Sequence, residues 1–231
     1  MIARPSDDLP AAFARLGGEE DARVWGELWD DLCHQGSVYD DSFPALPYLA
    51  AIATGRAPGA PLDAVLMAGL IVSAADGERT ARYAGETAAL LPVARALLDA
   101  ATDDAPAFVY LLQCVLAFEG ERVWSAGRLE GLFEQEYELD CPACASALFV
   151  GFGDHHAFAP DGDPLEADPA RAVLLPADPA ALESLPARLH RTATRAGHED
   201  IARGLTHLFG RAACPSCATA FTVSDEVRNN P

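Results

Sequence analysis

Apolar side chains recur every three or four residues through most of residues 6–133, and short turn signals separate the periodic stretches. This spacing places the apolar side chains on one face of an α-helix, so the segment predicts successive short helices. The expected helices cover residues 6–16, 62–75, 80–101 and 122–133, and three more begin near residues 19, 42 and 104. Because short links make consecutive helices antiparallel neighbours, this array predicts stacked helical hairpins.

Polar and glycine residues at the ends of the periodic stretches predict where helices begin and end. Ser42 and either Asp103 or Asp104 are expected N-caps, because a short polar side chain can accept a hydrogen bond from a free backbone N–H. Residues 62–75 are apolar nearly all round, which predicts a central helix that Gly77 ends.

The pattern changes after residue 133. Residues 136–139 alternate polar and apolar, and residues 148–150 are apolar, so each stretch predicts a short strand. Residues 151–176 are rich in Gly, Pro and Asp and predict a loop. Two helices are expected over about residues 178–210, and a polar tail follows the last cysteine. The sequence therefore predicts an α-helical domain over residues 1–133 and a second domain over residues 134–231.

One ten-residue segment occurs twice in the second domain. Residues 141–150 read CPACASALFV and residues 214–223 read CPSCATAFTV, so six of the ten positions are identical. Each copy resembles a zinc knuckle, a tight turn that directs two thiolates to one point before a strand. Two knuckles supply the four sulfurs that tetrahedral Zn²⁺ prefers, and such a closed site has no open position for a substrate. We expect one structural zinc ion, in a module that resembles a zinc ribbon, on Cys141, Cys144, Cys214 and Cys217.

Two features of this repeat depart from the zinc-ribbon pattern. The two pairs of cysteines are separated by 69 residues, whereas about 15–20 residues are usual. We interpret the intervening segment as an inserted helical hairpin, since the entropy of loop closure grows slowly with length. The other departure is at Ala145 and Ala218, where such knuckles commonly have Gly. A left-handed backbone there costs about 1–2 kcal/mol, which the free energy of zinc binding, about 10–16 kcal/mol, can offset.

The C-P-x-C motif also occurs in thioredoxin-like redox proteins, which place a strand before the motif and begin a helix at it. In this chain a strand-like run follows the motif, and the motif occurs twice. Disulfides are the other alternative, but they are rare in a reducing compartment. The spacing therefore favours zinc over redox chemistry and over disulfides.

Composition restricts the class of protein. Half of the 231 residues are hydrophobic, mostly Ala and Leu, which favours a mainly α protein. The net charge of −19 disfavours contact with nucleic-acid phosphates and anionic lipids. Residues 1–18 lack a secretory signal, and the most apolar stretch, residues 62–75, is too short to span a bilayer. We expect a cytoplasmic protein that binds neither nucleic acid nor membrane.

Several weaker groups of residues have candidate chemistry. Cys33 and Cys114 are expected on apolar helix faces as buried thiols. Residues 33–37 form a polar link, where His34, Gln35 and Tyr39 are expected to satisfy backbone groups. His155 and His156 follow Asp154 and are expected to be exposed, although a second metal site is the alternative. The acidic loop over residues 161–168 lacks the spacing of a calcium loop.

Residues 29–53 contain WDDLCHQGSVY followed by FPALPYL, and this segment resembles bacterial HEAT-repeat-like proteins. The resemblance implies stacked helical hairpins and a scaffold or interaction role, and it implies no catalytic residues. We therefore expect a non-enzymatic interaction protein whose partner is another protein, one with a basic surface because of the chain's negative charge. The alternative is an enzyme or small-molecule binder with a site near His34, Gln35 and Tyr39, or near His155 and His156.

Overall fold

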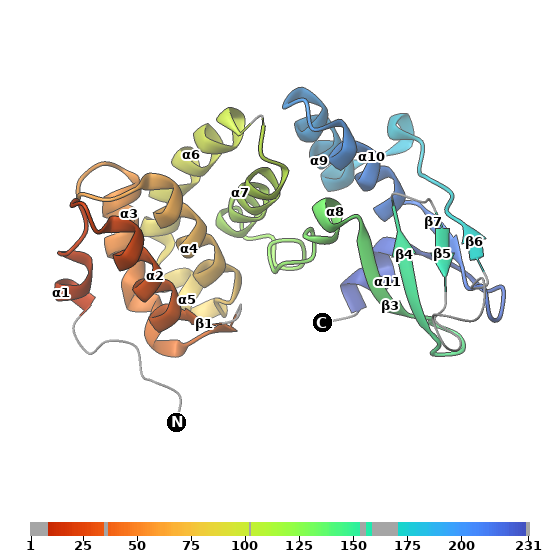
Figure 1. The fold of residues 1–231 in the computed structure, drawn as a ribbon, viewed down its shortest axis with the longest axis horizontal. Coiled ribbons are helices and arrows are strands. Elements are labelled where there is room, and N and C mark those ends of the chain that lie inside the picture. Colours follow the sequence, from red (N-terminus) through yellow and green to blue (C-terminus); the bar gives the residue numbers. More distant parts are fainter. Residues whose placement is uncertain (1–8, 35–36, 102, 153–155, 159–170, 230–231) are drawn as a thin grey trace. The chain divides into compact units, whose positions relative to one another are not determined.

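The computed structural model describes residues 9–34, 37–101, 103–152, 156–158 and 171–229 (Figure 1). Over these ranges the chain is mostly helical and has short antiparallel strands, so the prediction of a mainly α protein is confirmed. It divides into two compact units. The N-terminal unit comprises residues 1–101 and 110–127, and the C-terminal unit comprises residues 102–109 and 128–231. None of the helices in the described ranges has the combined length and apolar character that crossing a membrane requires.

Helices dominate the N-terminal unit because its apolar residues recur at helical spacing. The last helix, α7, is shared, since its residues 105–109 belong to the C-terminal unit. The elements are α1 Leu9–Phe13, α2 Asp21–Leu32, β1 Cys33–His34, β2 Ser37–Val38, the 3-10 helix η1 Asp40–Ala45, α3 Leu46–Ala53, α4 Pro61–Ser73, α5 Gly77–Arg82, α6 Ala84–Ala100 and α7 Ala105–Phe118.

Helix α4 lies at the centre of the N-terminal unit, where α3 and α6 pack against it and against each other. Val65, Met67 and Ile71 of α4 are fully buried, as its apolar sequence predicted. Burial of one such side chain stabilises a fold by about 1.5–3 kcal/mol. Gly69 on the same helix permits a close approach of α7, because a Cβ at this position would lie 2.3 Å from Sγ of Cys114. Close helix packing therefore accounts for the stability of this unit.

The link between α2 and η1 differs from the predicted polar link. Strands β1 and β2 pair antiparallel within this link. Cys33 was predicted to lie on a helix face, but it lies in strand β1. Ser42 was predicted to be the N-cap of a helix, but it lies inside η1, whose N-cap is Tyr39. Its buried Oγ donates a hydrogen bond to the carbonyl oxygen of Leu32 at 2.6 Å and accepts one from the backbone N–H of Tyr39 at 3.2 Å. This hydroxyl joins the end of α2 to η1.

Gly77 was predicted to end the helix before it, but α4 ends at Ser73 and Gly77 begins the next helix, α5. The Asp76 side chain accepts a hydrogen bond from the backbone N–H of Arg79 at 2.8 Å, which caps α5. Tyr83 then separates α5 from α6, so the helix predicted over residues 80–101 is present over residues 84–100 but begins four residues later than predicted. The predicted cap at Asp104 is confirmed, because its side chain accepts a hydrogen bond from the backbone N–H of Ala107 at 3.0 Å.

The helix predicted over residues 122–133 is also wrong. Most of this segment consists of turns, and only α8, Gly131–Glu134, is helical. The Glu121 carboxylate accepts hydrogen bonds from two successive backbone N–H groups, those of Val123 and Trp124, at 3.2 and 2.6 Å. Gly127 has φ +79°, a left-handed conformation that a continuous α-helix does not contain.

The C-terminal unit combines short strands with helices. One antiparallel sheet has the order β3-β4-β5-β6, and β7 and β8 form a second sheet. The two predicted helices between the knuckles are present and pack against each other. Besides α8, the elements are β3 Glu136–Asp140, β4 Ala147–Gly151, β5 His156–Phe158, β6 Arg171–Val173, the 3-10 helix η2 Pro179–Ala181, α9 Ser184–Arg195, α10 Glu199–Leu208, β7 Arg211–Ala213, β8 Ala220–Thr222 and α11 Val223–Asn229.

Two parts of this unit differ from the prediction. The segment over residues 151–176, expected to be a loop, contains β5 and β6, which extend the sheet begun by β3 and β4. The expected polar tail contains α11, whose Val223 and Val227 are buried. Both errors have the same cause, since strand pairing and the docking of a short helix depend on residues far away in the sequence.

Candidate metal centre

Each copy of the ten-residue repeat forms the tip of its own β-hairpin. The first knuckle closes the hairpin of β3 and β4, in which Asp140 pairs with Ala147. The second closes the hairpin of β7 and β8, in which Ala213 pairs with Ala220. The strand after each cysteine pair therefore pairs with the strand before it, and the two repeat strands do not pair with each other.

The backbone of both knuckles has the same hydrogen bonds. Cys141 N–H donates to the carbonyl oxygen of Ser146 at 2.9 Å, and Cys214 N–H donates to that of Thr219 at 2.9 Å. Ala145 and Ala218 follow the second cysteine of each pair, and both are left-handed, with φ +56° and +60°. Their N–H groups donate to the carbonyl oxygens of the first cysteines at 2.9 and 2.8 Å. The strained conformation considered at these two alanines is confirmed.

The two hairpin tips bring four sulfur atoms together. All four Sγ atoms, those of Cys141, Cys144, Cys214 and Cys217, lie within 4.8 Å of one another. Sγ of Cys141 is 3.7 Å from that of Cys217, and Sγ of Cys144 is 3.8 Å from that of Cys214. A tetrahedral ion with bonds of about 2.3 Å to sulfur holds its ligands about 3.8 Å apart. The distances across the cluster therefore fit one metal ion at its centre.

Each knuckle contributes one buried and one exposed sulfur. Cys141 and Cys214 are buried, whereas Cys144 and Cys217 are exposed. A hydroxyl lies 3.3 Å from each exposed sulfur, Ser146 Oγ beside Cys144 and Thr219 Oγ1 beside Cys217. These two hydroxyls occupy the same position in the two copies of the repeat. The repeat therefore contains a hydroxyl beside the exposed sulfur in each copy, in addition to its two cysteines.

These surroundings divide the thiols by acidity. The hydrogen bond with Ser146 lowers the pKa of Cys144 to about 6, and the hydrogen bond with Thr219 lowers the pKa of Cys217. Burial raises the pKa of Cys141 to about 11. A thiol must lose its proton to bind a metal ion. The two exposed thiols therefore lose their protons more readily than an ordinary thiol, and the charge of a metal ion held by the cluster would also favour the thiolate of Cys141.

The strands behind the knuckles hold the sulfur cluster in place. Equivalent positions of the repeat are buried in both copies, Leu148 with Phe221 and Val150 with Val223. Helix α11 follows directly and packs against both β3 and β8, which come from different hairpins. The hairpins are therefore joined at their apolar strands as well as at their tips.

The other candidate residues are not gathered into a site within the described ranges. Gln35, Asp154, His155 and the acidic residues 161–168 lie outside these ranges, and His34 and His156 are described only as backbone in β1 and β5. Tyr39 is half-buried and its backbone N–H binds Ser42. Cys33 and Cys114 are buried, as predicted, and burial raises the pKa of each thiol to about 12.

Two histidines on the inserted helices contribute to the core of the C-terminal unit. His198 is buried, and its ring lies 4.2 Å from that of Phe108. His207 is buried, and its ring lies 5.8 Å from that of Phe152. These contacts make the two imidazoles part of the aromatic packing of this unit.

Sequence reasoning found the four cysteines but missed the roles of Ser146 and Thr219. The signal was present, because both copies of the repeat carry a hydroxyl two residues after the second cysteine. A cavity beside Arg15, Glu27 and Asp31 was also missed, and no motif marks it.

Comparisons with protein-family models, curated proteins and solved structures gave no match to this chain.

Proposed function

We propose that this chain is a non-enzymatic interaction protein whose C-terminal unit is stabilised by one structural Zn²⁺ ion. The observation that carries the proposal is the cluster of four cysteine sulfurs, whose separations match one tetrahedral ion. Four protein ligands complete the coordination of zinc and leave no position for a substrate or an activated water. A reducing compartment such as the cytoplasm suits this role, because it keeps the thiols available.

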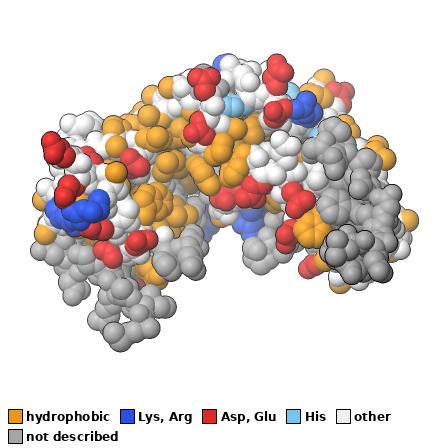
Figure 2. Space-filling model, viewed as in Figure 1, with side chains coloured by type: hydrophobic (Ala, Val, Ile, Leu, Met, Phe, Trp, Pro, Cys, Tyr) orange, Lys and Arg blue, Asp and Glu red, His pale blue; other side chains and the backbone are white. Residues whose placement is uncertain are grey.

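The proposed partner is another protein with a basic surface. The net charge of −19 favours such a partner, since opposite charge steers two proteins together. Figure 2 shows Asp and Glu side chains spread over the face in view, with fewer Arg side chains among them. The resemblance of residues 29–53 to HEAT-repeat-like proteins supports an interaction role for the helices, and the packed pair of α3 and α4 is compatible with it.

Metal content tests the zinc part of the proposal. We expect mass spectrometry of the purified chain to find about one zinc per molecule. Cys141→Ser and Cys214→Ser remove one ligand from each knuckle and should abolish this zinc. Cys33→Ala is the matched control, since it removes a cysteine that lies outside the cluster and should retain the metal. Retention of zinc in both ligand variants would overturn the proposal, and so would one iron ion with visible thiolate absorption.

A pull-down tests the interaction part. We expect the intact chain to retain one defined protein at low salt and to lose it as salt screens the charges, because the Debye length falls from about 10 Å at 0.1 M to about 3 Å at 1 M. Failure to retain any defined protein, or retention that salt does not change, would contradict a charge-steered partner.

A further inference from the structure

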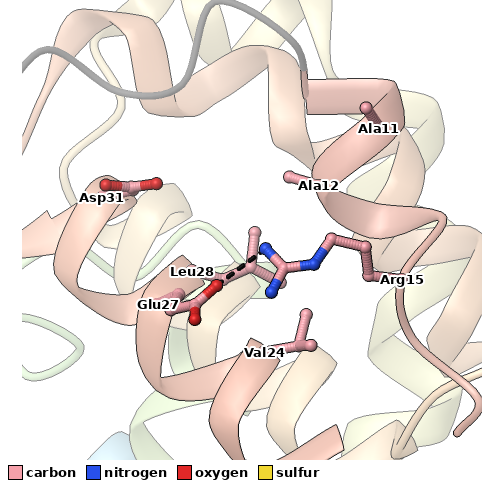
Figure 3. A pocket seen from close by; sticks show the side chains of 7 residues that line it. All are labelled: Ala11, Ala12, Arg15, Val24, Glu27, Leu28 and Asp31. Carbon is pink, nitrogen blue, oxygen red and sulfur yellow. Dashed lines mark ion pairs between the residues drawn. The ribbon is translucent and has the colours of Figure 1, made fainter. Parts of the chain in front are cut away.

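A cavity of about 220 Å³ lies between α1, the turn that follows it, and α2 (Figure 3). Ala12, Val24 and Leu28 supply apolar walls, and Arg15, Glu27 and Asp31 supply charged groups. All of these residues belong to the N-terminal unit. The cavity is therefore far in sequence from the four cysteines and independent of their chemistry.

An internal ion pair uses two of the three charged groups. Arg15 Nη1 lies 2.7 Å from Glu27 Oε2, and Arg23 pairs with the other oxygen of the same carboxylate. The hydrogen bond from Arg15 lowers the pKa of Glu27, which keeps this pair charged. Figure 3 shows Arg15 extending across the cavity to meet Glu27 on α2. Neither group of this pair is left to bind a ligand of opposite charge.

Asp31 is the third charged group and lies one helical turn after Glu27. Figure 3 shows it on α2, across the open space from Ala12. It is half-buried, and it makes no ion pair or hydrogen bond within the described parts of the chain. The cavity thus combines apolar walls with one carboxylate that has no partner among the residues that the structure describes, and its charged groups sum to a net negative charge.

This combination fits a side chain with an apolar stem and a cationic end. The stems of Arg and Lys pack against apolar surface while their charged ends reach polar groups. A guanidinium matches the planar fork of a carboxylate, and an ammonium binds it as a point charge. An anionic ligand is disfavoured by Asp31 and by the charge of the whole chain. A divalent metal ion is disfavoured because a single free carboxylate supplies too few ligands.

We propose that this cavity binds an arginine or lysine side chain of the protein partner, with its stem against Val24 and Leu28 and its cationic end on Asp31. The inference rests on the proposed function, because it assigns a contact point to the basic partner. Beyond the proposed function, it specifies where on the molecule the partner binds and names Asp31 as the residue that recognises the cation.

The test uses the full-length, zinc-loaded chain and small probes in an NMR titration. The probes are the N-acetyl methylamides of arginine, lysine and citrulline, of which citrulline has the shape of arginine without its charge. We expect arginine and lysine to shift backbone amide signals of α1 and α2 and to leave those of the C-terminal unit unchanged. Citrulline should bind at least about tenfold more weakly, a difference that corresponds to about 1.4 kcal/mol.

Two pairs of variants connect the shifts to the cavity. Asp31→Asn should weaken arginine binding at least about tenfold, whereas Asp30→Asn removes the same charge from an exposed neighbour that does not line the cavity and should change it little. Ala12→Leu should fill the cavity and abolish the shifts, whereas Ala14→Leu alters an exposed residue outside the lining and should preserve them.

Three outcomes would overturn the inference: equal binding of citrulline and arginine, unchanged binding by Asp31→Asn, or binding that appears only after removal of residues 1–8. The last result would make that segment of the chain the occupant. These failures differ from failure of the proposed function. Suppose that the chain holds one zinc and retains a partner through salt-sensitive contacts, and that the Asp31→Asn variant does so equally well. The proposed function would then stand, and only the contact point at Asp31 would be refuted.

Discussion

The two units of this protein are stabilised in different ways, and their cysteines show the difference. In the N-terminal unit, helices α3, α4 and α6 bury apolar side chains against one another, and Cys33 and Cys114 are buried thiols with strongly raised pKa values. In the C-terminal unit, β7 and β8 have three residues each, and the hairpin tips carry cysteines whose exposed members have lowered pKa values. One residue type thus serves as a small hydrophobe in one unit and forms a sulfur cluster that could hold a metal ion in the other.

The comparison shows that the surroundings of a cysteine decide its chemistry. Burial among apolar groups disfavours the thiolate, while a nearby hydroxyl stabilises it. It also shows that short strands need another source of stability, because an isolated two-stranded hairpin is marginal in water. A metal ion bound only by the folded knuckles would supply it, since its binding free energy would become folding free energy.

Metal removal should produce the largest difference in stability between the two units. A chelator that extracts zinc removes about 10–16 kcal/mol of binding free energy from the C-terminal unit. We expect hydrogen exchange of β3, β4, β7 and β8 to accelerate at least about a hundredfold, which corresponds to a loss of about 2.7 kcal/mol of protection. Exchange in α3, α4 and α6 should change little. Mass spectrometry of exchanged peptides makes the measurement, and equal acceleration in both units would contradict the comparison.

Alkylation should distinguish the cysteines of the two units in metal-free protein. At pH 7 a thiol with a pKa of about 6 is mostly thiolate, whereas a thiol with a pKa of about 12 has only about one thiolate in 10⁵ molecules. We expect iodoacetamide to modify Cys144 at least about a hundredfold faster than Cys33 or Cys114. The rate at Cys144 should fall about tenfold between pH 7 and pH 5, because its thiolate is lost as the pH falls through its pKa.

Peptide mapping of the alkylated protein gives these rates. Zinc-loaded protein is the control, since metal-bound sulfurs should resist the reagent. Similar alkylation rates at Cys144 and Cys114 in folded protein would show that the surroundings of these two cysteines do not change the acidity of their thiols.

Gly69→Ala should weaken the N-terminal unit through its helix packing. The added Cβ would lie 2.3 Å from Sγ of Cys114, so the helices must shift. We expect a loss of about 1–3 kcal/mol in the free energy of unfolding of this unit. Gly26→Ala is the matched control, because its Cβ would meet no atom within 4 Å on a helix, and it should stabilise by about 0.5–1 kcal/mol.

Chemical denaturation followed by the signals of each unit measures both glycine variants. Metal content should remain unchanged in both of them. A loss of zinc in Gly69→Ala would show that metal binding in the C-terminal unit depends on the helix packing of the N-terminal unit, which would contradict separate stabilisation of the two units.

Ser42→Ala should have an effect of similar size in the N-terminal unit. It removes a buried hydroxyl that binds the carbonyl oxygen of Leu32 and the N–H of Tyr39, at a cost of about 1–3 kcal/mol. Ser73→Ala removes a single bond to the carbonyl oxygen of Leu70 from a half-buried position and should cost about 0.5–1 kcal/mol. Thermal unfolding compares the two, and equal midpoints would show that Ser42 does not join α2 to η1 energetically.

Ala145→Gly should give the smallest change, and in the opposite direction. Glycine relieves a left-handed alanine that costs about 1–2 kcal/mol, and it loses about 0.5–1 kcal/mol of backbone entropy relative to alanine. We expect a net stabilisation of about 0.5–1 kcal/mol in the metal-bound C-terminal unit, seen by denaturation with zinc present. Ala147→Gly is the control, since it lies in β4, has no positive φ, and should destabilise by about 0.5–1 kcal/mol.

Short-range sequence patterns predicted most of the helices and the four clustered cysteines. Helix α10 was predicted because an apolar face repeats within a few residues, and the central helix α4 because its residues are apolar nearly all round. The knuckles were predicted because the hydrogen bonds that close them lie within six residues, so each copy of the repeat encodes its own turn and its left-handed alanine. Their occurrence in duplicate identified the four cysteines as one set.

Tertiary structure decided the features that depend on distant residues. The sequence did not indicate that β5 and β6 extend the sheet, that α11 docks on β3 and β8, or that residues 122–133 form turns, because pairing and docking energies come from partners far along the chain. The sulfur–sulfur distances and the cavity that Asp31 lines likewise exist only after folding. The amino-acid sequence thus specified which four cysteines form one set, while the fold specified where their sulfur atoms meet.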